Sequence, residues 1–304
     1  MKLEEIDFDE FIDKLEVKIP SGKEFQKLGD STALFRDKQG NFVRLNYERG
    51  ILLYALVAKY KPKNILEFGT ASGYGTLCMA WAMADHDIDG KIFTIDIESM
   101  EKTTIKPIDL GNGPSNVSTS RKEIWDKVGK KEWFKHIKSL TGYSAEIMSK
   151  EILPKIQFAY IDGPHFFDGV RHDFYSFLKV ADDRFCVLFD DYIDRPFYGV
   201  KKLIDTEISN FFDPILIHSD KQEDILKMKM TSDSKYGMCW IDSESLKCPI
   251  DSAYNKTYLN EQIKKYQKFE KRLKFRNSIN EKIPFLKKIR FQSNKNKNKS
   301  LINC

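Results

Sequence analysis

The chain has 304 residues, of which 41% are hydrophobic and 13% aromatic, and it carries 50 Lys or Arg against 45 Asp or Glu. This composition is sufficient for a large core and excludes global disorder, and no apolar run approaches the roughly 18 residues of a membrane-spanning helix. The net charge of +5 is uneven, because residues 255–304 contain 15 Lys or Arg and 3 Glu and leave the preceding part acidic.

The start of the chain is acidic and lacks the apolar segment of a signal peptide. The five cysteines are odd in number and form no Cys-x-x-Cys pair, so neither a disulfide framework nor a zinc site is indicated. We therefore expect reduced thiols and a cytoplasmic protein.

Taken in order, residues 1–45 mix charged and apolar positions, and we expect short helices there that cover one face of the next domain. Apolar residues then recur at helical spacing up to Tyr60, where Lys61 and Pro62 end the helix. Over residues 46–245 apolar strands alternate with helices, which predicts a mostly parallel, doubly wound α/β sheet with its ligands at the carboxyl ends of the strands. The predicted strands are 64–69, 91–96, 137–141, 157–162, 184–190, 214–218 and 237–242.

Two segments depart from this alternation. Residues 98–122 are rich in Gly, Pro, Asn, Ser and Thr, and a loop of this length is either a lid over a substrate or an inert insertion. Its position after a strand end favours the lid. Residues 246–304 predict an amphipathic, Lys-rich helix followed by a low-complexity, disordered tail at 294–300. The basic segment from 255 onward either packs on the domain or docks on an anionic membrane face or a partner enzyme.

The stretch NILEFGTASGYG at residues 64–75 reads as a strand, a glycine-rich turn and a helix start. Gly69, Gly73 and Gly75 permit positive φ and the close approach of a ligand, as in a nucleoside site, although an ordinary strand–helix turn has the same spacing. Glu67 would repel a pyrophosphate but could accept a hydrogen bond from an ammonium group. The turn therefore favours a cationic nucleoside ligand over a dinucleotide.

Acids end three further strands. Asp96 ends the strand at 91–96, where a carboxylate either accepts hydrogen bonds from ribose hydroxyls or is simply solvated. Asp162, Asp190 and Asp191 end two later strands and should meet at the same sheet edge, where Mg²⁺ or Ca²⁺ would relieve their repulsion, unless they only cap helices. His165 follows on the same turn as a general base or as a hydrogen-bonding residue.

These motifs together resemble the class I S-adenosylmethionine-dependent methyltransferases over residues 45–242. The resemblance implies a Rossmann-like, seven-stranded methyltransferase sheet with an N-terminal helical cover and a C-terminal basic helical extension. It implies that the glycine turn holds the methionine end of the cofactor, that Asp96 holds the ribose, and that TGYSAE at 141–146 contacts adenine, with Tyr143 where the family usually has Asp. The implied cofactor-binding residues are Glu67, Gly69, Ala71, Ser72, Gly73, Tyr74, Asp96, Gly142, Tyr143, Ser144 and Asp162.

The stretch IDGPHFFDGVRHD at 161–173 is similar to a bacterial subgroup that includes macrocin O-methyltransferase and cephalosporin-hydroxylase-like proteins, although Pro164 stands where the subgroup has a second Asp. The spacing of Asp162, Asp190 and Asp191 is also similar to the metal ligands of catechol O-methyltransferase. The resemblance thus implies Mg²⁺, or another divalent cation, at these three acids, and proton removal by Asp162 or His165 from a hydroxyl of a sugar, glycan or glycosylated small molecule.

Three other functions are compatible with parts of this sequence. A nucleotide-dependent oxidoreductase shares the fold but requires a Gly-x-Gly-x-x-Gly turn, which is absent. A nucleic-acid methyltransferase would use the basic tail, but the acidic domain and the Asp-Gly-Pro-His turn at 162–165 disfavour it. A non-catalytic cofactor-binding scaffold would have no reason to collect the acids. The sequence leaves the oligomeric state open.

Overall fold

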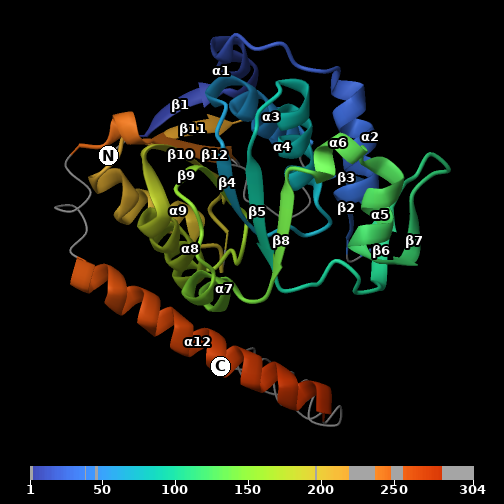
Figure 1. Ribbon diagram of the computed structural model, residues 1–304. Coiled ribbons are helices and arrows are strands. Elements are labelled where there is room, and N and C mark those ends of the chain that lie inside the picture. Colours follow the sequence, from blue (N-terminus) through green and yellow to red (C-terminus); the bar gives the residue numbers. More distant parts are fainter. Residues whose placement is uncertain are drawn as a thin grey trace, which may run out of the picture.

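The computed structural model describes residues 3–282, apart from 38, 45–46, 196, 219–236 and 248–255. At its centre is a sheet with the strand order β1-β11-β12-β10-β9-β4-β5-β8, in which β12 runs antiparallel to both neighbours and the other pairs are parallel (Figure 1). The strands are β1 (Glu4–Asp7), β4 (Asn64–Phe68), β5 (Lys91–Asp96), β8 (Ile137–Thr141), β9 (Ile156–Ile161), β10 (Ala181–Tyr192), β11 (Ile215–His218) and β12 (Gly237–Asp242).

All seven predicted strands are present, so the mixed α/β fold with a mostly parallel sheet is confirmed. The predicted count of seven is wrong, because β1 adds an eighth strand at the edge in the described part of the chain. This strand pairs in parallel with β11, with Glu5 opposite Leu216. A four-residue strand with two exposed acids has little local signal, and its partner lies far away in the sequence.

Helices cover both faces of the sheet (Figure 1). Along β4, Ile65 packs into the core shared with α3 and α4, whereas its neighbour Leu66 packs into the core shared with α8 and α9. This alternation is the two-residue period of a strand buried on both faces. The first group is α1 (Phe8–Leu15), α2 (Gly22–Thr32), α3 (Glu48–Tyr60), α4 (Tyr74–Asp85), α5 (Arg121–Val128) and α6 (Lys131–Phe134); the second is α7 (Ser144–Lys150), α8 (Phe167–Val180), α9 (Val200–Thr206) and α12 (Lys256–Lys282), with short 3₁₀ turns at Ile208–Asn210 and Ser243–Ser245.

The N-terminal region and the predicted lid meet each other. The first contains α1 and α2, as expected, and also β1 and a small hairpin of β2 (Leu34–Arg36) and β3 (Phe42–Arg44). The second forms a hairpin of β6 (Thr104–Ile108) and β7 (Ser115–Thr119). The Asp109 N–H donates to the Asp30 carbonyl at 2.9 Å, and the Ser31 hydroxyl donates to the Asp109 carbonyl at 2.9 Å, so this hairpin docks beside α2.

The basic segment forms the long helix α12, as expected, and it lies alongside α7 and α8 (Figure 1). Its apolar stripe faces the domain, with Ile263 and Tyr266 buried. Among the described helices none has both the length and the apolar character needed to cross a bilayer. The predicted tail at 294–300 lies outside the described residues, and the division of the chain at 45 and 245 and the docking of 255–304 stay predictions.

Candidate active site

The glycine turn between β4 and α4 depends on close backbone contact. Gly69 has φ +92°, and a Cβ there would lie 2.0 Å from the carbonyl oxygen of Asp162. The carboxyl ends of β4 and β9 therefore touch at a point where only glycine fits. Gly73, at φ +99°, begins α4, and a Cβ there would lie 2.2 Å from the indole nitrogen of Trp125.

Helix α5 holds this turn from outside. The indole N–H of Trp125 donates to the Ser72 carbonyl at 2.9 Å, and Nε of Arg121 donates to the Ala71 carbonyl at 2.6 Å. Arg121 also forms an ion pair with Asp96 at 3.2 Å, and the Ala71 N–H donates to the same carboxylate at 2.8 Å. Arg121 thus connects the glycine turn to the acid at the end of β5.

A pocket of about 330 Å³ opens beside the turn. It is lined by Phe68, Gly69, Ala71, Ile95, Asp96, Ile97, Gly142, Tyr143, Ser144, Asp162, Gly163, Pro164, Phe166, Asp173, Tyr266, Glu270 and Leu273. Seven of the predicted cofactor-binding residues are in this lining, and Ser72 and Gly73 lie next to it in the turn. No residue of the predicted lid at 98–122 lines the pocket, so the role of that segment as a lid stays a prediction.

Glu67 and Tyr74, two other predicted cofactor contacts, lie outside the pocket lining. Glu67 is buried under the turn, where its carboxylate accepts hydrogen bonds from the hydroxyls of Thr76 and Thr94. Burial raises the pKa of Glu67 to about 7, against the lowering effect of these two hydrogen bonds. The Tyr74 hydroxyl donates to the Tyr47 carbonyl at 2.6 Å, so its side chain joins α4 to the start of α3.

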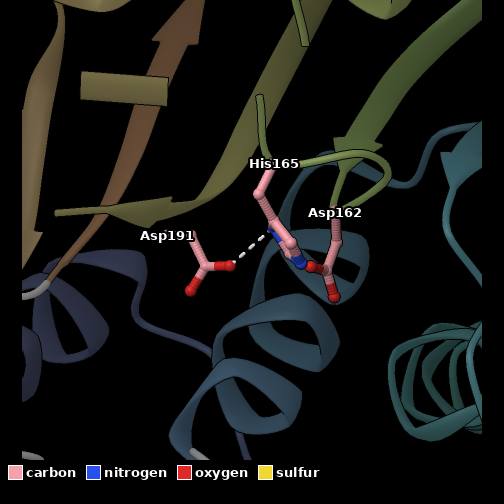
Figure 2. A group of neighbouring side chains, drawn as sticks. All are labelled: Asp162, His165 and Asp191. Carbon is pink, nitrogen blue, oxygen red and sulfur yellow. Dashed lines mark ion pairs between the residues drawn. The ribbon is translucent and has the colours of Figure 1, made fainter. Parts of the chain in front are cut away.

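The predicted catalytic residues meet where β9 and β10 end. Figure 2 shows the imidazole of His165 between the carboxylates of Asp162 and Asp191. Nδ1 of His165 is 2.8 Å from Oδ2 of Asp191, and one ligand atom from each of the three residues lies within 4.8 Å of the others. Asp191 has φ +58° at an irregularity in the pairing of β10 with β12, which turns its side chain relative to a regular strand.

Asp190 takes a different direction from Asp191. Its carboxylate is 1% exposed and accepts hydrogen bonds from Arg49 at 2.8 Å and from the Tyr160 hydroxyl at 3.0 Å. Arg49 comes from α3 and also lies 3.3 Å from Asp162. The structure therefore groups Asp162 and Asp191 with His165, whereas the predicted third ligand, Asp190, is engaged by Arg49.

Both predicted catalytic groups have raised pKa values. Burial, then the charge of Asp190, raises the pKa of Asp162 well above its usual value, and Arg49 opposes this only in part. The pKa of His165 rises to about 9: burial opposes the rise, but the hydrogen bond to Asp191 and the charge of that carboxylate outweigh it. Without a bound cation the imidazole is therefore protonated at neutral pH, and a metal ion would have to displace this proton to bind a ring nitrogen.

The comparison with protein families decides what this domain is. A family model described as a methyltransferase domain matches residues 66–192. Residues 66–192 are a methyltransferase domain. The match begins in β4 and ends with β10, so it includes the glycine turn, Asp96 and the acids at 162 and 191. The methyltransferase predicted from the sequence is thereby confirmed for this part of the chain.

Solved structures similar to the chain have low identity. The O-methyltransferase TomG from Streptomyces achromogenes, in complex with SAM, is 16% identical with a TM-score of 0.48, and the match covers 77% of this chain and 94% of that one. An O-methyltransferase from Bacillus cereus, in complex with SAH, is 14% identical with a TM-score of 0.46, over 77% and 96% of the two chains. No curated protein matches the chain. The methyltransferase assignment rests on the family model.

The set of donors in the methyltransferase domain fits a divalent cation, with a different third ligand from the one predicted. Mn²⁺, Fe²⁺ and Zn²⁺ readily bind two carboxylates and one imidazole. Mg²⁺ instead prefers oxygen ligands alone. The mutual repulsion of the three acids is already relieved in part without a metal, because Arg49 faces two of them.

Sequence reasoning missed three groups at this site: Arg49, Arg121 and the α12 residues Tyr266 and Glu270. Arg49 is a charge in the first turn of a helix whose residues 50–58 carry no charge, a signal that could have marked it as the partner of a buried acid. Arg121 directly follows the capping residue Ser120 and looks like an ordinary surface residue. The two α12 residues lie on a helix whose only local signal is its apolar stripe.

Proposed function

We propose that the chain transfers a methyl group from S-adenosylmethionine to a hydroxyl oxygen of a sugar, a glycan or a glycosylated small molecule, with a divalent cation at Asp162, His165 and Asp191. One observation carries this proposal. The pocket beside the glycine turn contains both Asp96 and Asp162, and Asp162 is also part of the group with His165 and Asp191. A nucleoside site and an acid–base site thus share one residue at one edge of the sheet.

The chain's residues would divide the work as follows. The carboxylate of Asp96, held by Arg121 and the Ala71 N–H, is oriented to accept from ribose hydroxyls. Gly69 and Ala71 line the pocket, so the cofactor's methionine end would pass close to the backbone of the turn. Asp162 lies between this end and His165, where it can accept the proton of an acceptor hydroxyl as the oxygen attacks the methyl group.

A cation at Asp162, His165 and Asp191 would lower the pKa of the acceptor hydroxyl and fix the position of its oxygen. Mg²⁺ is the ion expected from the sequence, and the imidazole extends the choice to Mn²⁺ and similar ions. The ion pair between His165 and Asp191 supports the metal-free alternative, in which the imidazole donates a hydrogen bond to the acceptor and Asp162 alone takes the proton.

Aromatic side chains next to His165 support a sugar as acceptor. The ring of Tyr198 stacks on His165 with centroids 5.0 Å apart, and the neighbouring Phe197 is 93% exposed with φ +74°. An exposed phenylalanine next in sequence to the ring that stacks on His165 offers a flat apolar face of the kind against which a sugar ring can pack. The identity of the sugar does not follow from this geometry.

The proposal is tested with two measurements on the same preparation. Calorimetry should show binding of S-adenosylhomocysteine, and the absence of binding would overturn the proposed cofactor. Transfer of a labelled methyl group to a panel of sugars and glycosylated compounds should stop in chelator and return on adding Mg²⁺ or Mn²⁺. Asp191→Ala should abolish the transfer and leave cofactor affinity within about 3-fold, whereas the exposed Asp194→Asn serves as a control with normal transfer. Full transfer in chelator would rule out the cation.

A further inference from the structure

Helix α12 is fixed on the methyltransferase domain by several specific contacts. Lys274 forms an ion pair with Glu146 of α7 at 2.8 Å, and Lys179 of α8 donates to Asn260 at 2.9 Å. Between these ends, the ring of Tyr266 lies 4.6 Å from the ring of His172. The helix is therefore held at both ends and in the middle, against both α7 and α8.

Three residues of this helix line the pocket: Tyr266, Glu270 and Leu273. They lie beyond the stretch that matches the methyltransferase family, which ends at residue 192. In the pocket they are joined by Tyr143 and Ser144 from the loop after β8. The lining thus combines α12 and the β8–α7 connection with the ends of β4, β5 and β9 and with Asp173 of α8.

The part of the pocket near Gly69 and Asp96 differs in chemistry from the part that α12 lines. Gly69 and Asp96 mark the portion suited to the amino acid and ribose of the proposed cofactor, which leaves the α12 end for the base. Apolar side chains of Ile97, Phe166 and Leu273 occur in the lining and suit the faces of a flat ring. A base seated there would present its edge to whatever polar group closes the end.

Glu270 is the polar group that α12 brings to this end. Its side chain is 4% exposed, and Oε1 accepts hydrogen bonds from the Ala145 N–H at 3.1 Å and from the Ser144 hydroxyl at 3.4 Å. Both donors sit at the start of α7 and fix the carboxyl group in place. A carboxylate offers about four acceptor positions, so acceptor capacity remains for a further donor.

We infer that Glu270 accepts a hydrogen bond from the exocyclic amine of the cofactor's adenine base, and that α12 thereby selects adenosyl over inosyl ligands. This inference rests on the proposed function. The physical reason is the hydrogen-bonding character of the base edge. Adenine carries a donor amine where hypoxanthine carries an acceptor carbonyl, and a carbonyl oxygen facing a buried carboxylate is repelled. Burial raises the pKa of Glu270, with the N–H groups of Ala145 and Glu146 opposing the rise.

A second acid lies in the same lining and is the competing acceptor. Asp173 of α8 is fully buried, with Oδ1 3.1 Å from Nδ1 of His172. If Asp173 received the amine, selection of the base would survive changes at Glu270 and fail in Asp173→Asn. The experiment must therefore include both acids.

The experiment measures binding of S-adenosylhomocysteine and of S-inosylhomocysteine, its deaminated analogue, by calorimetry on the full chain. For the unaltered protein we expect the adenosyl ligand to bind roughly 10- to 100-fold more tightly, the range for one hydrogen bond to a charged group. Glu270→Gln keeps an oxygen for the Ala145 N–H and adds an amide that can donate to the inosyl carbonyl. Its preference should fall below about 5-fold. The exposed Lys268→Gln on the same helix should keep the original ratio.

The outcomes separate the two proposals. If the unaltered protein binds neither ligand, the proposed cofactor is wrong. If it binds the adenosyl ligand and Glu270→Gln keeps the full preference, or if Asp173→Asn alone abolishes it, the inference is wrong and the proposed function stands. A melting temperature measured for each variant identifies unfolding, and because the readout is a ratio of two ligands on one protein, a uniform loss of folded material leaves it unchanged.

Discussion

The guanidinium group of Arg49 lies 2.8 Å from the carboxylate of Asp190 and 3.3 Å from that of Asp162. One cation from α3 thus sits between acids at the ends of two adjacent strands. The arginine side chain is 16% exposed and that of Asp190 only 1%. The acids at this edge of the sheet therefore have a partner supplied by the chain itself.

Replacing Arg49 by methionine should destabilise the protein strongly. The change leaves Asp190 buried without its cationic partner and beside Asp162, and breaking a buried pair in this way costs about 3–5 kcal/mol. Urea unfolding at pH 7.5 measures the effect, with Lys59→Met on the exposed part of the same helix as the control. Adding Asp190→Asn should recover part of the loss. A single variant as stable as the control would show that the pair contributes nothing to the fold.

The buried acid Glu67 should make stability depend on pH. Its pKa is about 7 in the folded chain, against the ordinary value of 4.5. Between these values the folded chain keeps a proton that the unfolded chain has released, so the free energy of unfolding falls as pH rises and levels off above about 7. Each pKa unit corresponds to about 1.4 kcal/mol, so the difference between about 7 and 4.5 gives a contribution on the order of 3–4 kcal/mol.

Glu67→Gln tests this dependence, since the amide oxygen can still accept from Thr76 and Thr94. The stability of the variant relative to the unaltered protein should increase from pH 4.5 to pH 8, as measured by unfolding at several pH values without cofactor. Glu101 is an exposed acid, so the free energy of unfolding of Glu101→Gln should change with pH as that of the unaltered protein does. Parallel curves for Glu67→Gln as well would contradict a raised pKa at this position.

Two glycines with the same backbone conformation should respond differently to alanine. Gly69 and Gly111 have φ +92° and +103°, but a Cβ at Gly69 would meet the Asp162 carbonyl at 2.0 Å whereas nothing lies within 4 Å of one at Gly111. Gly111→Ala should cost only the strain of the left-handed conformation, about 1 kcal/mol. Gly69→Ala should cost several times more, because β4 and β9 must separate, and should abolish binding of S-adenosylhomocysteine. Equal melting temperatures for the two variants would show that the strand ends can move apart freely.

Arg121 should act on the cofactor through Asp96 and the glycine turn. Arg121→Met removes the hydrogen bond to the Ala71 carbonyl and the ion pair with Asp96, so the acid is held only by the N–H groups of Ala71 and Glu98. We expect the Kd of S-adenosylhomocysteine to rise roughly 10-fold, equivalent to about 1.4 kcal/mol. Lys122→Met, at the exposed neighbouring position, is the matched control. An unchanged Kd for Arg121→Met would mean that the turn keeps its shape without α5.

The sequence predicted those parts of the fold that have a local signal. Apolar runs ended by acids or glycines located the strands β4, β9 and β10, and helical periodicity located α3 and α12. The strand β1 was missed because its partner in the described part of the sheet is β11, far along the chain. The hairpin of β6 and β7 was missed because Gly- and Ser-rich sequence favours a loop until docking on α2 supplies its partners.

The site residues likewise divide into those with a local sequence signal and those without one. Asp162, His165 and Asp191 were predicted because each closely follows or ends an apolar strand. The partners of Asp190 could not be predicted, since Arg49 lies 141 residues away and its guanidinium reaches the acid only after α3 has packed on the sheet. The side chains of Asp190 and Asp191 point in different directions because the end of β10 is irregular, and no residue pattern predicts this irregularity.

The position of α12 has a consequence for the order in which the protein matures. During synthesis, which adds about 5–20 residues per second, residues 66–192 emerge well before α12, which begins 64 residues later. The strands and the glycine turn can then assemble while the end of the pocket that α12 lines is still open to solvent. A nascent chain would have the Asp162 edge of the site before it has Tyr266 and Glu270, so firm retention of a nucleoside would begin only when α12 docks.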